Sequence, residues 1–230
     1  MRVSVLGTGM AGQVLSGKIA ELGHDVMVGT RDVQALLART ERGNADTQPF
    51  SEWLAEHPGV KVGTFAEASA HGEVVFNATA GLATLEALEA AEPQNLAGKI
   101  LIDVSNPLDH SAGFPPTLSV CNTDSLGEQI QRAHPKARVV KTLNTVNAYV
   151  MVDPKGLGDG DHHVFVSGDD PAAREEVTGI LREWFGWEHV VDLGDISTAR
   201  GPEMYVALWL RLFGALGDPL VNVKVVSERG

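Results

Sequence analysis

The chain has 230 residues, of which 43% are hydrophobic and 21% charged, and its formal net charge is -12 at pH 7. This length and this composition fit one large globular domain with room for a small addition. The net negative charge argues against nucleic acid and against anionic membrane surfaces as partners, because both repel an acidic protein.

The first thirty residues predict a strand, a helix and a second strand. Residues 2–6 and 24–28 are short runs rich in valine, which is typical of buried parallel strands. Between them, Leu15, Ile19 and Leu22 repeat at the spacing of one helix face. Together these segments predict a βαβ unit at the N-terminus.

The same alternation continues along the rest of the chain. We expect strands at residues 60–62, 74–78, 99–104, 139–143, 163–167 and 189–192. We expect helices at 32–42, 65–71 and 82–91, one that Thr123 or Asp124 caps and that stops before Pro135, one from Asp170 to Gly186, and one that Pro202 opens and that runs over 205–216. Strands alternating with helices favour a Rossmann-type, doubly wound and mostly parallel α/β sheet.

The strongest motif is the glycine-rich turn Gly7-Thr8-Gly9-Met10-Ala11-Gly12, which lies between the first predicted strand and helix. In dinucleotide-binding units the first glycine allows a tight turn, the second lets the backbone approach a pyrophosphate, and the third lets helix and strand pack closely. Unpaired N–H groups at the start of the helix add partial positive charge. We therefore predict a dinucleotide site, with a glycine-rich turn that binds no ligand as the alternative.

The end of the second strand favours NADP over NAD. In NAD-binding units a carboxylate usually stands here and binds the ribose 2′-hydroxyl. In this chain the place falls on Thr30, and Arg31 follows it. A hydroxyl and a guanidinium suit a 2′-phosphate. Two alternatives stay open: Asp32 could turn onto the ribose, which would favour NAD, and Arg31 could be an ordinary surface arginine.

Small or polar, uncharged residues follow three later strands, in the segments 77–80, 105–108 and 144–145. Ligands of open α/β sheets bind outside the carboxyl ends of the strands. These residue types suit a ribose and a nicotinamide carboxamide, although ordinary turns use the same residue types. We therefore expect the nicotinamide end of the cofactor to lie there.

Groups that would act as acid, base, nucleophile or metal ligand do not stand out. The central part of the chain has no Tyr-x-x-x-Lys pair, and Gly-x-Ser-x-Gly is absent. The pair His162-His163 lacks neighbours that could bind a metal with it, so we expect both histidines to be exposed. We assign no catalytic residue and no metal site.

Cys121 is the single cysteine of the chain. Because one cysteine cannot form an internal disulfide, we expect a reducing, cytoplasmic setting. We expect Cys121 itself to be a buried or half-buried small residue and not a catalytic thiol. No apolar run approaches the roughly 20 residues of a membrane helix, and a strand begins directly at the N-terminus, so we expect neither a membrane span nor a signal peptide.

Taken together, these sequence motifs resemble those of the NADPH-dependent F420 reductase family, also called coenzyme F420:NADP oxidoreductases. The resemblance covers nearly the whole chain and rests on the segments Gly7 to Gly12, Gly29 to Arg31, Asp103 to Leu108, Val140 to Thr145, and Asn222 to Val226. The glycine-rich turn is shared by many families. The Lys-x-x-Asn-Thr and Asn-x-Lys-Val-Val patterns in the last two segments are more particular to this one.

The resemblance implies a homodimer that passes hydride between NADPH and a small-molecule acceptor, the deazaflavin coenzyme F420, with a flavin as a second candidate. Such a transfer depends on the alignment of two stacked rings more than on an acid or a base. The resemblance also implies an NADP-binding Rossmann domain at residues 1–150. A small C-terminal α/β extension at residues 151–230 would complete the acceptor site.

By position, the resemblance gives roles to individual residues. Thr8, Gly9, Met10 and Ala11 would bind the pyrophosphate, Thr30 and Arg31 the 2′-phosphate, and Thr79, Ala80, Asn106 and Asn144 the nicotinamide end. Four cations are candidates to meet an acidic acceptor tail, each with a plain surface or helix-end charge as its alternative: Lys141, Arg200, Arg211 and Lys224. The segment 113–116, Gly-Phe-Pro-Pro, is expected to form a lip over the cofactor.

Two other functions stay open. An NADP-dependent reductase of a small organic substrate, such as a β-hydroxyacid or an imine, usually appends a long all-helical domain with a catalytic lysine, and only about 80 residues follow the sheet here. A non-catalytic NADP-binding redox sensor would bind the dinucleotide without turnover.

Overall fold

The computed structural model describes residues 1–43 and 46–228, and its strands form one large sheet and one small hairpin. The strands of the large sheet are β1 (Arg2–Leu6), β2 (Asp25–Thr30), β3 (Lys61–Thr64), β4 (Val74–Asn77), β5 (Ile100–Asp103), β8 (Arg138–Lys141), β9 (His163–Ser167) and β10 (His189–Gly194). The hairpin consists of β6 (Leu108–Asp109) and β7 (Thr117–Leu118), which pair antiparallel.

The large sheet has eight strands in the order β10-β9-β8-β5-β4-β1-β2-β3. Each neighbouring pair is parallel except β8 and β9, which meet antiparallel at Lys141 and Ser167. From β3 to β8 this is the strand order of a Rossmann dinucleotide fold. The predicted doubly wound, mostly parallel α/β architecture is therefore confirmed. The two strands after residue 150 extend the same sheet.

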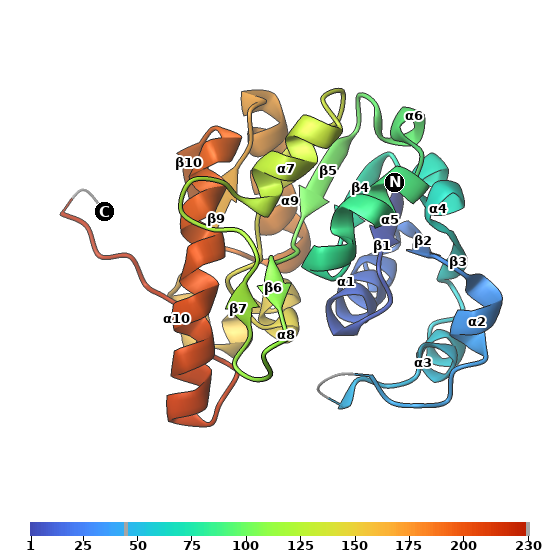
Figure 1. Cartoon of the computed structure of the whole chain (residues 1–230), viewed down its shortest axis with the longest axis horizontal. Helices are drawn as coiled ribbons and strands as arrows, with labels where there is room; N and C mark the ends of the chain where they lie inside the picture. The colour runs from blue at the N-terminus through green and yellow to red at the C-terminus, as the bar shows by residue number, and fades with distance from the viewer. Residues whose placement is uncertain (44–45, 229–230) are drawn as a thin grey trace.

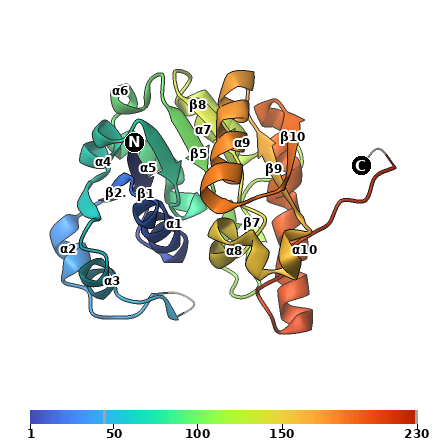
Figure 2. The ribbon, with the colours of Figure 1, turned by 180° about the vertical axis from the view of Figure 1, so that it is seen from behind.

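The helices are α1 (Met10–Glu21), α2 (Val33–Leu37), α3 (Phe50–Glu56), α4 (Phe65–His71), α5 (Thr84–Ala90), α6 (Pro93–Leu96), α7 (Leu126–Ala133), α8 (Ala148–Val152), α9 (Pro171–Phe185) and α10 (Arg200–Leu216). Figures 1 and 2 show them on both sides of the sheet, with α4, α5 and α7 toward the viewer in Figure 1 and α1, α8 and α9 toward the viewer in Figure 2. Within the described residues, no helix combines the length and the apolar character that a membrane span requires.

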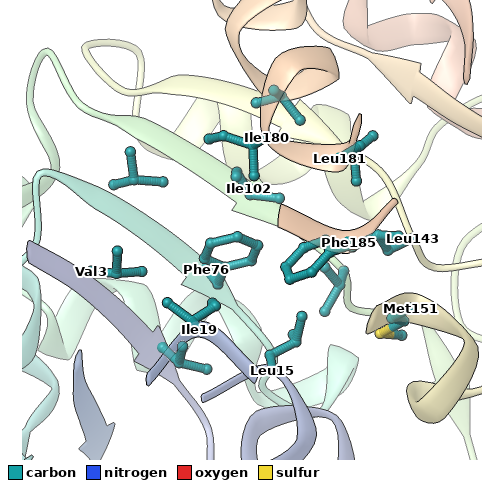
Figure 3. Close-up of a cluster of buried hydrophobic side chains, with 14 of the residues drawn as sticks. Val3, Leu15, Ile19, Phe76, Ile102, Leu143, Met151, Ile180, Leu181 and Phe185 are labelled. Atoms are coloured by element: carbon teal, nitrogen blue, oxygen red, sulfur yellow. The ribbon is translucent and has the colours of Figure 1, made fainter. Parts of the chain in front are cut away.

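Two apolar layers hold the helices to the sheet. One layer joins α1, α3, α8 and α9 to one face, and the other joins α4, α5 and α7 to the opposite face. Figure 3 shows the first layer, in which Phe76 of β4 lies near Ile19 of α1 and meets the edge of the Phe185 ring at 6.3 Å between ring centroids. These buried side chains fix α1 and α9 against the sheet, which in turn fixes the loops at the strand ends.

Several predicted boundaries change in the structure. The helix expected at 32–42 covers only Val33–Leu37, and the helix before Pro135 is capped by Ser125 instead of Thr123 or Asp124. The Ser125 hydroxyl accepts a hydrogen bond from the backbone N–H of Glu128 at 3.1 Å, which is the ordinary N-cap geometry. The hairpin β6–β7 and the five-residue helix α8 were not predicted.

Two further sequence predictions about single residues are wrong. Cys121 is exposed, whereas a buried or half-buried position was expected. His162 is buried, whereas an exposed one was expected. Its ring lies within 3.0 Å of the Pro154 carbonyl oxygen through Nε2 and within 2.7 Å of the Asn222 side chain through Nδ1. The reason is the segment after α10, which runs beside the start of β9 and covers the histidine. Beyond that segment, the described chain up to residue 228 projects away from the body of the molecule (Figures 1 and 2).

Candidate functional site

The candidate site begins where the strand order reverses, between β1 and β4. From β1 the chain moves to β2 and β3 on one side and returns to β4 on the other. In open α/β sheets, this switch point leaves a crevice at the carboxyl ends of the strands, and ligands bind there. The glycine-rich turn follows β1 directly, and the loop of residues 78–81 follows β4. Both loops therefore border the crevice.

The three glycines of the turn have three different surroundings. Gly7 has φ +115°, and a Cβ there would lie 2.5 Å from the Ala78 carbonyl oxygen. A Cβ at Gly12 would overlap the Gly7 carbonyl oxygen, whereas a Cβ at Gly9 would meet nothing within 4 Å. The first and third glycines are therefore required by packing inside the protein. The second leaves backbone open to a ligand.

The start of α1 is suited to an anion. Gly9 is the N-cap and provides no side chain to bond the first N–H groups of the helix. Those groups have no partner within the helix, and they give its start a partial positive charge. No acidic residue lies in the first turn. The buried Gln13 side chain donates hydrogen bonds to the Thr8 carbonyl oxygen at 3.1 Å and the Gln48 carbonyl oxygen at 3.0 Å, which fixes the turn.

At the end of β2, the guanidinium of Arg31 is exposed to solvent. Thr30 is the last residue of the strand, and the Arg31 side chain is 69% exposed. Its ion pair with Glu86 spans 3.3 Å between two exposed groups, so solvent competes with it. Asp32, the alternative partner of a ribose, accepts a hydrogen bond from Ala35 N–H at 2.9 Å as the N-cap of α2. This contact gives the Asp32 carboxylate a local role.

A cavity of about 610 Å³ adjoins the glycine-rich turn. Five of the twelve residues that the sequence assigned to the cofactor line it: Met10, Ala11, Thr79, Ala80 and Asn106. The structure adds residues from four places that the sequence did not indicate: Gly81 and Leu82 after β4, residues 109–111 of the hairpin, Asn147, Ala148 and Met151 in and before α8, and Trp209 on α10. Gly7, Gly9 and Gly12 lie beside this cavity in the turn, whereas Thr30 and Arg31 lie at the end of β2.

The loops after β4 and β5 are in close contact. A Cβ at Gly81 would overlap the carbonyl oxygen of Asn106, so only glycine allows this approach. Asn106 and Asn144 are joined by two hydrogen bonds, from Asn106 Nδ2 to the Asn144 carbonyl oxygen at 2.8 Å and from Asn144 Nδ2 to Asn106 Oδ1 at 3.0 Å. Asn144 is buried and positions Asn106, which itself lines the cavity.

The turn after β8 contains a strained backbone conformation at Leu143. Leu143 has φ +59°, a left-handed conformation that is unfavourable for a bulky residue. Its side chain is buried in the apolar layer next to α8 (Figure 3). The burial of Leu143 and the Asn106–Asn144 bonds hold this turn in place. Such conformations persist where the surrounding structure fixes them, and they gather at functional sites.

A buried charge cluster lies under the loop after β5. Lys141 Nζ donates to Asp103 Oδ2 and to the Ser105 carbonyl oxygen, both at 2.7 Å, and pairs with Glu203 Oε1 at 2.8 Å. The side chains of Lys141 and Asp103 are fully buried, and that of Glu203 is 2% exposed. Burial alone would lower the pKa of the Lys141 amine, but the two carboxylates outweigh it and hold this pKa above its ordinary value.

This cluster connects the cavity to the C-terminal helix. Asp103 Oδ1 accepts hydrogen bonds from Asn77 Nδ2 and from Ser105 Oγ, both at 2.7 Å, and Asn77 Oδ1 accepts one from Thr79 Oγ1 at 2.7 Å. Ser105 and Thr79 line the cavity. Glu203 lies on α10 and also accepts the N–H groups of residues 126 and 127 at 2.7 and 2.9 Å. A continuous set of bonds therefore runs from the cavity wall to α10 and the start of α7.

The four cations considered for an acidic acceptor tail have different surroundings. Lys141 is buried in the cluster above, so the expectation of an accessible charge there is wrong. Arg200 donates to Glu128 at 2.8 and 2.6 Å, and Lys224 pairs with Asp161. Arg211 lies exposed on α10. In the described part of the chain, no three histidine, cysteine or acidic side chains gather as a metal site would need.

Residues 2–107 match the family model described as "NADP oxidoreductase coenzyme F420-dependent". The chain is 55% identical to a protein from Arthrobacter sp. FB24, described as a proposed F420-dependent NADP-reductase. The crystal structure of that protein superposes with a TM-score of 0.93, and the match covers 98% of this chain and 99% of that one. The F420-dependent NADP reductase of Methanothermobacter marburgensis is 28% identical over 223 residues, which cover 92% of each chain.

Other similar proteins are longer. Metalloreductase STEAP3 of Rattus norvegicus is 28% identical over 212 residues, which make up 92% of this chain but 37% of that protein. A reductive aminase from Aspergillus terreus, solved with NADPH and ethyl levulinate, shares the fold at 17% identity and a TM-score of 0.62 over 62% of its length. The 55% identity over almost the whole of both chains decides the assignment: this chain belongs to the family of coenzyme F420-dependent NADP oxidoreductases.

Proposed function

We propose that this protein transfers hydride between NADPH and a flat deazaflavin or flavin acceptor, with coenzyme F420 as the first candidate. The observation that carries the proposal is the cavity of about 610 Å³, because it joins the glycine-rich turn to the C-terminal helix α10. Part of the cavity wall comes from the glycine-rich turn and the loop after β4, and another part comes from α10. A cavity built from both parts of the chain can bring the reacting rings of two ligands together.

The glycine-rich turn fits NADPH. The open backbone at Gly9 and the free N–H groups at the start of α1 suit the pyrophosphate, while Thr8, Met10 and Ala11 border it. Gly7 and Gly12 keep the turn close to β4 and α1. Bound here, NADPH supplies a hydride from its nicotinamide ring.

The end of β2 fits the extra phosphate of NADPH. Arg31 can release the exposed Glu86 carboxylate and bind the 2′-phosphate, with Thr30 beside it as a hydroxyl donor. A phosphate carries more charge than one carboxylate, which favours this exchange. We propose that these two residues distinguish NADPH from NADH.

The cavity residues align the rings and limit water. Hydride transfer between two carbon atoms needs no protein acid or base at the moment of transfer, and it depends on close and correct orientation. Thr79, Ala80 and Asn106 lie at the strand ends where the nicotinamide is expected, and the Asn144 side chain holds Asn106 in place. Residues 151–230 contribute Met151 and Trp209 to the cavity wall, which supports their assignment to the acceptor site.

Reduction of coenzyme F420 in a mixture with purified protein and NADPH tests the proposal. Bleaching of the visible absorption band of the deazaflavin, with equal oxidation of NADPH, is the expected result. Bleaching of FMN alone would assign a flavin as the acceptor. Binding of NADPH without oxidation by deazaflavin, flavin, imine or carbonyl acceptors would contradict the proposal and favour a redox sensor. Arg31→Ala is the matched control, because it alters cofactor binding without touching the cavity.

We also propose that the protein forms a homodimer through α10. This helix exposes Met204, Leu208 and Leu216, with exposed fractions of 38%, 53% and 65%. Several large exposed apolar side chains on one surface helix are consistent with an interface. Light scattering on a size-exclusion column measures the mass directly, and a monomer at micromolar concentration would contradict the dimer.

A further inference from the structure

Among the described residues that line the cavity, Trp209 has the largest aromatic ring, and His110 of the hairpin has the other ring. Trp209 lies on α10, whereas Met10 and Ala11 of α1 and Ala78 to Gly81 after β4 line other parts of the cavity. Figures 1 and 2 both show α10 and α1 on opposite sides of the β6–β7 hairpin. The indole therefore comes from a different part of the chain than the elements that suit the dinucleotide.

The indole is held in a fixed orientation by the protein. Its Nε1–H donates to the Val221 carbonyl oxygen at 3.1 Å, and its ring packs on Phe213 at 5.8 Å between centroids. Phe213 in turn meets the edge of the Phe114 ring, in the loop between β6 and β7, at 6.1 Å. Because the N–H group already has a partner, the indole offers a ligand its apolar ring and not a hydrogen bond.

The buried charge cluster sets the position of Trp209 relative to the sheet. Glu203 and Trp209 lie on the same helix, about 9 Å apart along its axis at 1.5 Å per residue. Glu203 pairs with Lys141, which also bonds Asp103 and the Ser105 carbonyl oxygen. The loop after β5 that lines the cavity and the helix that carries the indole are therefore joined through one ammonium group.

The other cavity side chains favour a flat ligand beside the indole. The wall includes small residues from three elements, namely Ala11, Ala78, Ala80 and Ala148. Small side chains leave space, and a rigid aromatic face binds flat rings through dispersion and stacking. A nicotinamide is one six-membered ring, so a cavity of this size keeps room for a second and larger ring system.

We propose that Trp209 is the acceptor-side wall of the site and determines its preference for flat polycyclic acceptors; this inference rests on the proposed function. The acceptor ring lies between the nicotinamide and the indole. The Trp209 ring contributes to binding of the acceptor and not to binding of NADPH. The fixed position of α10 sets the distance between the two rings.

Calorimetric titration of F420 and of FMN into the NADP⁺-saturated protein tests this role. Trp209→Leu is expected to weaken binding of the acceptor about tenfold, in line with the loss of one ring-stacking contact. Trp209→Phe keeps an aromatic ring and is expected to lose less. The matched control is Trp184→Phe on α9, whose ring packs on His24 and Phe185 and does not line the cavity. NADPH affinity and the unfolding midpoint are measured for each variant.

Steady-state kinetics separate the possible outcomes. The expected result is a raised KM for the acceptor with unchanged NADPH affinity in Trp209→Leu, and no change in Trp184→Phe. Unchanged acceptor affinity in both Trp209 variants would overturn the inference, and so would an equal loss of NADPH affinity. If Trp209→Leu does not fold, Trp209→Phe decides by the same criteria. If the wild-type protein reduces no acceptor, the proposed function fails, while the calorimetric titrations still decide whether Trp209 contacts flat rings.

Discussion

Two cationic side chains at strand ends, Arg31 and Lys141, lie in opposite electrostatic surroundings. Arg31 follows β2 and is 69% exposed, with Glu86 at 3.3 Å as its partner. Lys141 ends β8, is fully buried, and lies between Asp103 and Glu203 at 2.7 and 2.8 Å. The first cation can exchange its partner for a ligand. Lys141 keeps its two carboxylate partners, because all three side chains are buried together.

The difference follows from solvation. An exposed ion pair contributes about 0–1 kcal/mol, since water competes for both charges. An intact buried ion pair stabilises the fold no more than apolar residues of similar volume would. Removal of one partner, however, leaves the other charge buried and unpaired, which is strongly destabilising. Lys141 has three N–H donors, and its three contacts use them all. We therefore expect Lys141 to be structural and Arg31 to bind the cofactor.

Replacement of Lys141 is expected to have the largest effect on stability. Lys141→Met leaves Asp103 and Glu203 buried without their cation, which is expected to lower the free energy of unfolding by about 3–5 kcal/mol. Urea denaturation followed by circular dichroism measures this loss. Arg31→Met, at an exposed position, is the matched control and is expected to change stability by less than about 0.5 kcal/mol. Equal losses in the two variants would contradict the comparison.

The glycine-rich turn offers a second contrast between a packed and an open position. Gly12→Ala places a Cβ against the Gly7 carbonyl oxygen, so it is expected to distort the turn and to lower both the stability and NADPH affinity. Gly9→Ala meets no protein atom within 4 Å, so stability is expected to stay within about 0.5 kcal/mol of the wild type. NADPH affinity is expected to fall at least about tenfold, because the methyl group occupies the path of the pyrophosphate.

Thermal unfolding and NADPH titration of both glycine variants provide the measurement. Undiminished NADPH affinity in Gly9→Ala would show that the pyrophosphate does not approach the turn. A stable Gly12→Ala protein with normal affinity would show that the close approach of helix and strand is not required.

The pair of Arg31 and Glu86 gives a third effect, which is confined to one of the two dinucleotides. Arg31→Ala is expected to weaken NADPH binding roughly ten- to a hundredfold through loss of a charge-assisted hydrogen bond, with NADH binding nearly unchanged. Glu86→Gln removes the carboxylate that competes for the guanidinium, and is expected to strengthen NADPH binding about two- to fivefold. Equilibrium titration with both dinucleotides measures these ratios. Parallel losses for NADPH and NADH in Arg31→Ala would exclude contact with the 2′-phosphate.

Regular sequence patterns predicted most of the sheet and its longer helices. The runs for β1 and α4 were predicted with their observed bounds, and α9 begins after its Asp170 cap and ends at Gly186 with φ +82°. The hairpin β6–β7 has two residues in each strand, which is too short for an alternating pattern to be visible. The same reason applies to α8, which has five residues.

The site was predicted where it depends on strand ends and missed where it depends on packing between distant segments. Met10, Thr79 and Asn106 follow strands of a parallel sheet, and the topology alone brings them to one edge. The burial of Lys141 depends on Glu203, and the position of Trp209 depends on how α10 crosses the sheet. No local sequence pattern predicts the burial of Lys141 or the position of Trp209. The one indication in the sequence was that Lys141 lies in a valine-rich strand.

The smallest expected effect concerns a partly exposed ion pair with good geometry, Arg132 and Asp124. Arg132 donates to Asp124 at 2.9 and 2.7 Å, and these bonds are the main cause that lowers the pKa of Asp124 from 3.8 to about 2. Because this pKa is lower in the folded protein than in the unfolded chain, the contribution to stability is present above about pH 3.8 and is lost as the pH falls toward about 2.

Arg132→Gln is therefore expected to raise the pKa of Asp124 and to lower stability near neutral pH by no more than about 1 kcal/mol. The difference in stability from the wild type is expected to shrink as the pH falls below about 3.8 and the carboxylate takes up a proton in both proteins. NMR titration of the carboxyl carbon and urea denaturation over this pH range measure both effects. Arg132 is 60% exposed, whereas Lys141 is not exposed at all. If Arg132→Gln lowered the free energy of unfolding as much as Lys141→Met, solvent exposure would not explain the difference between the two ion pairs.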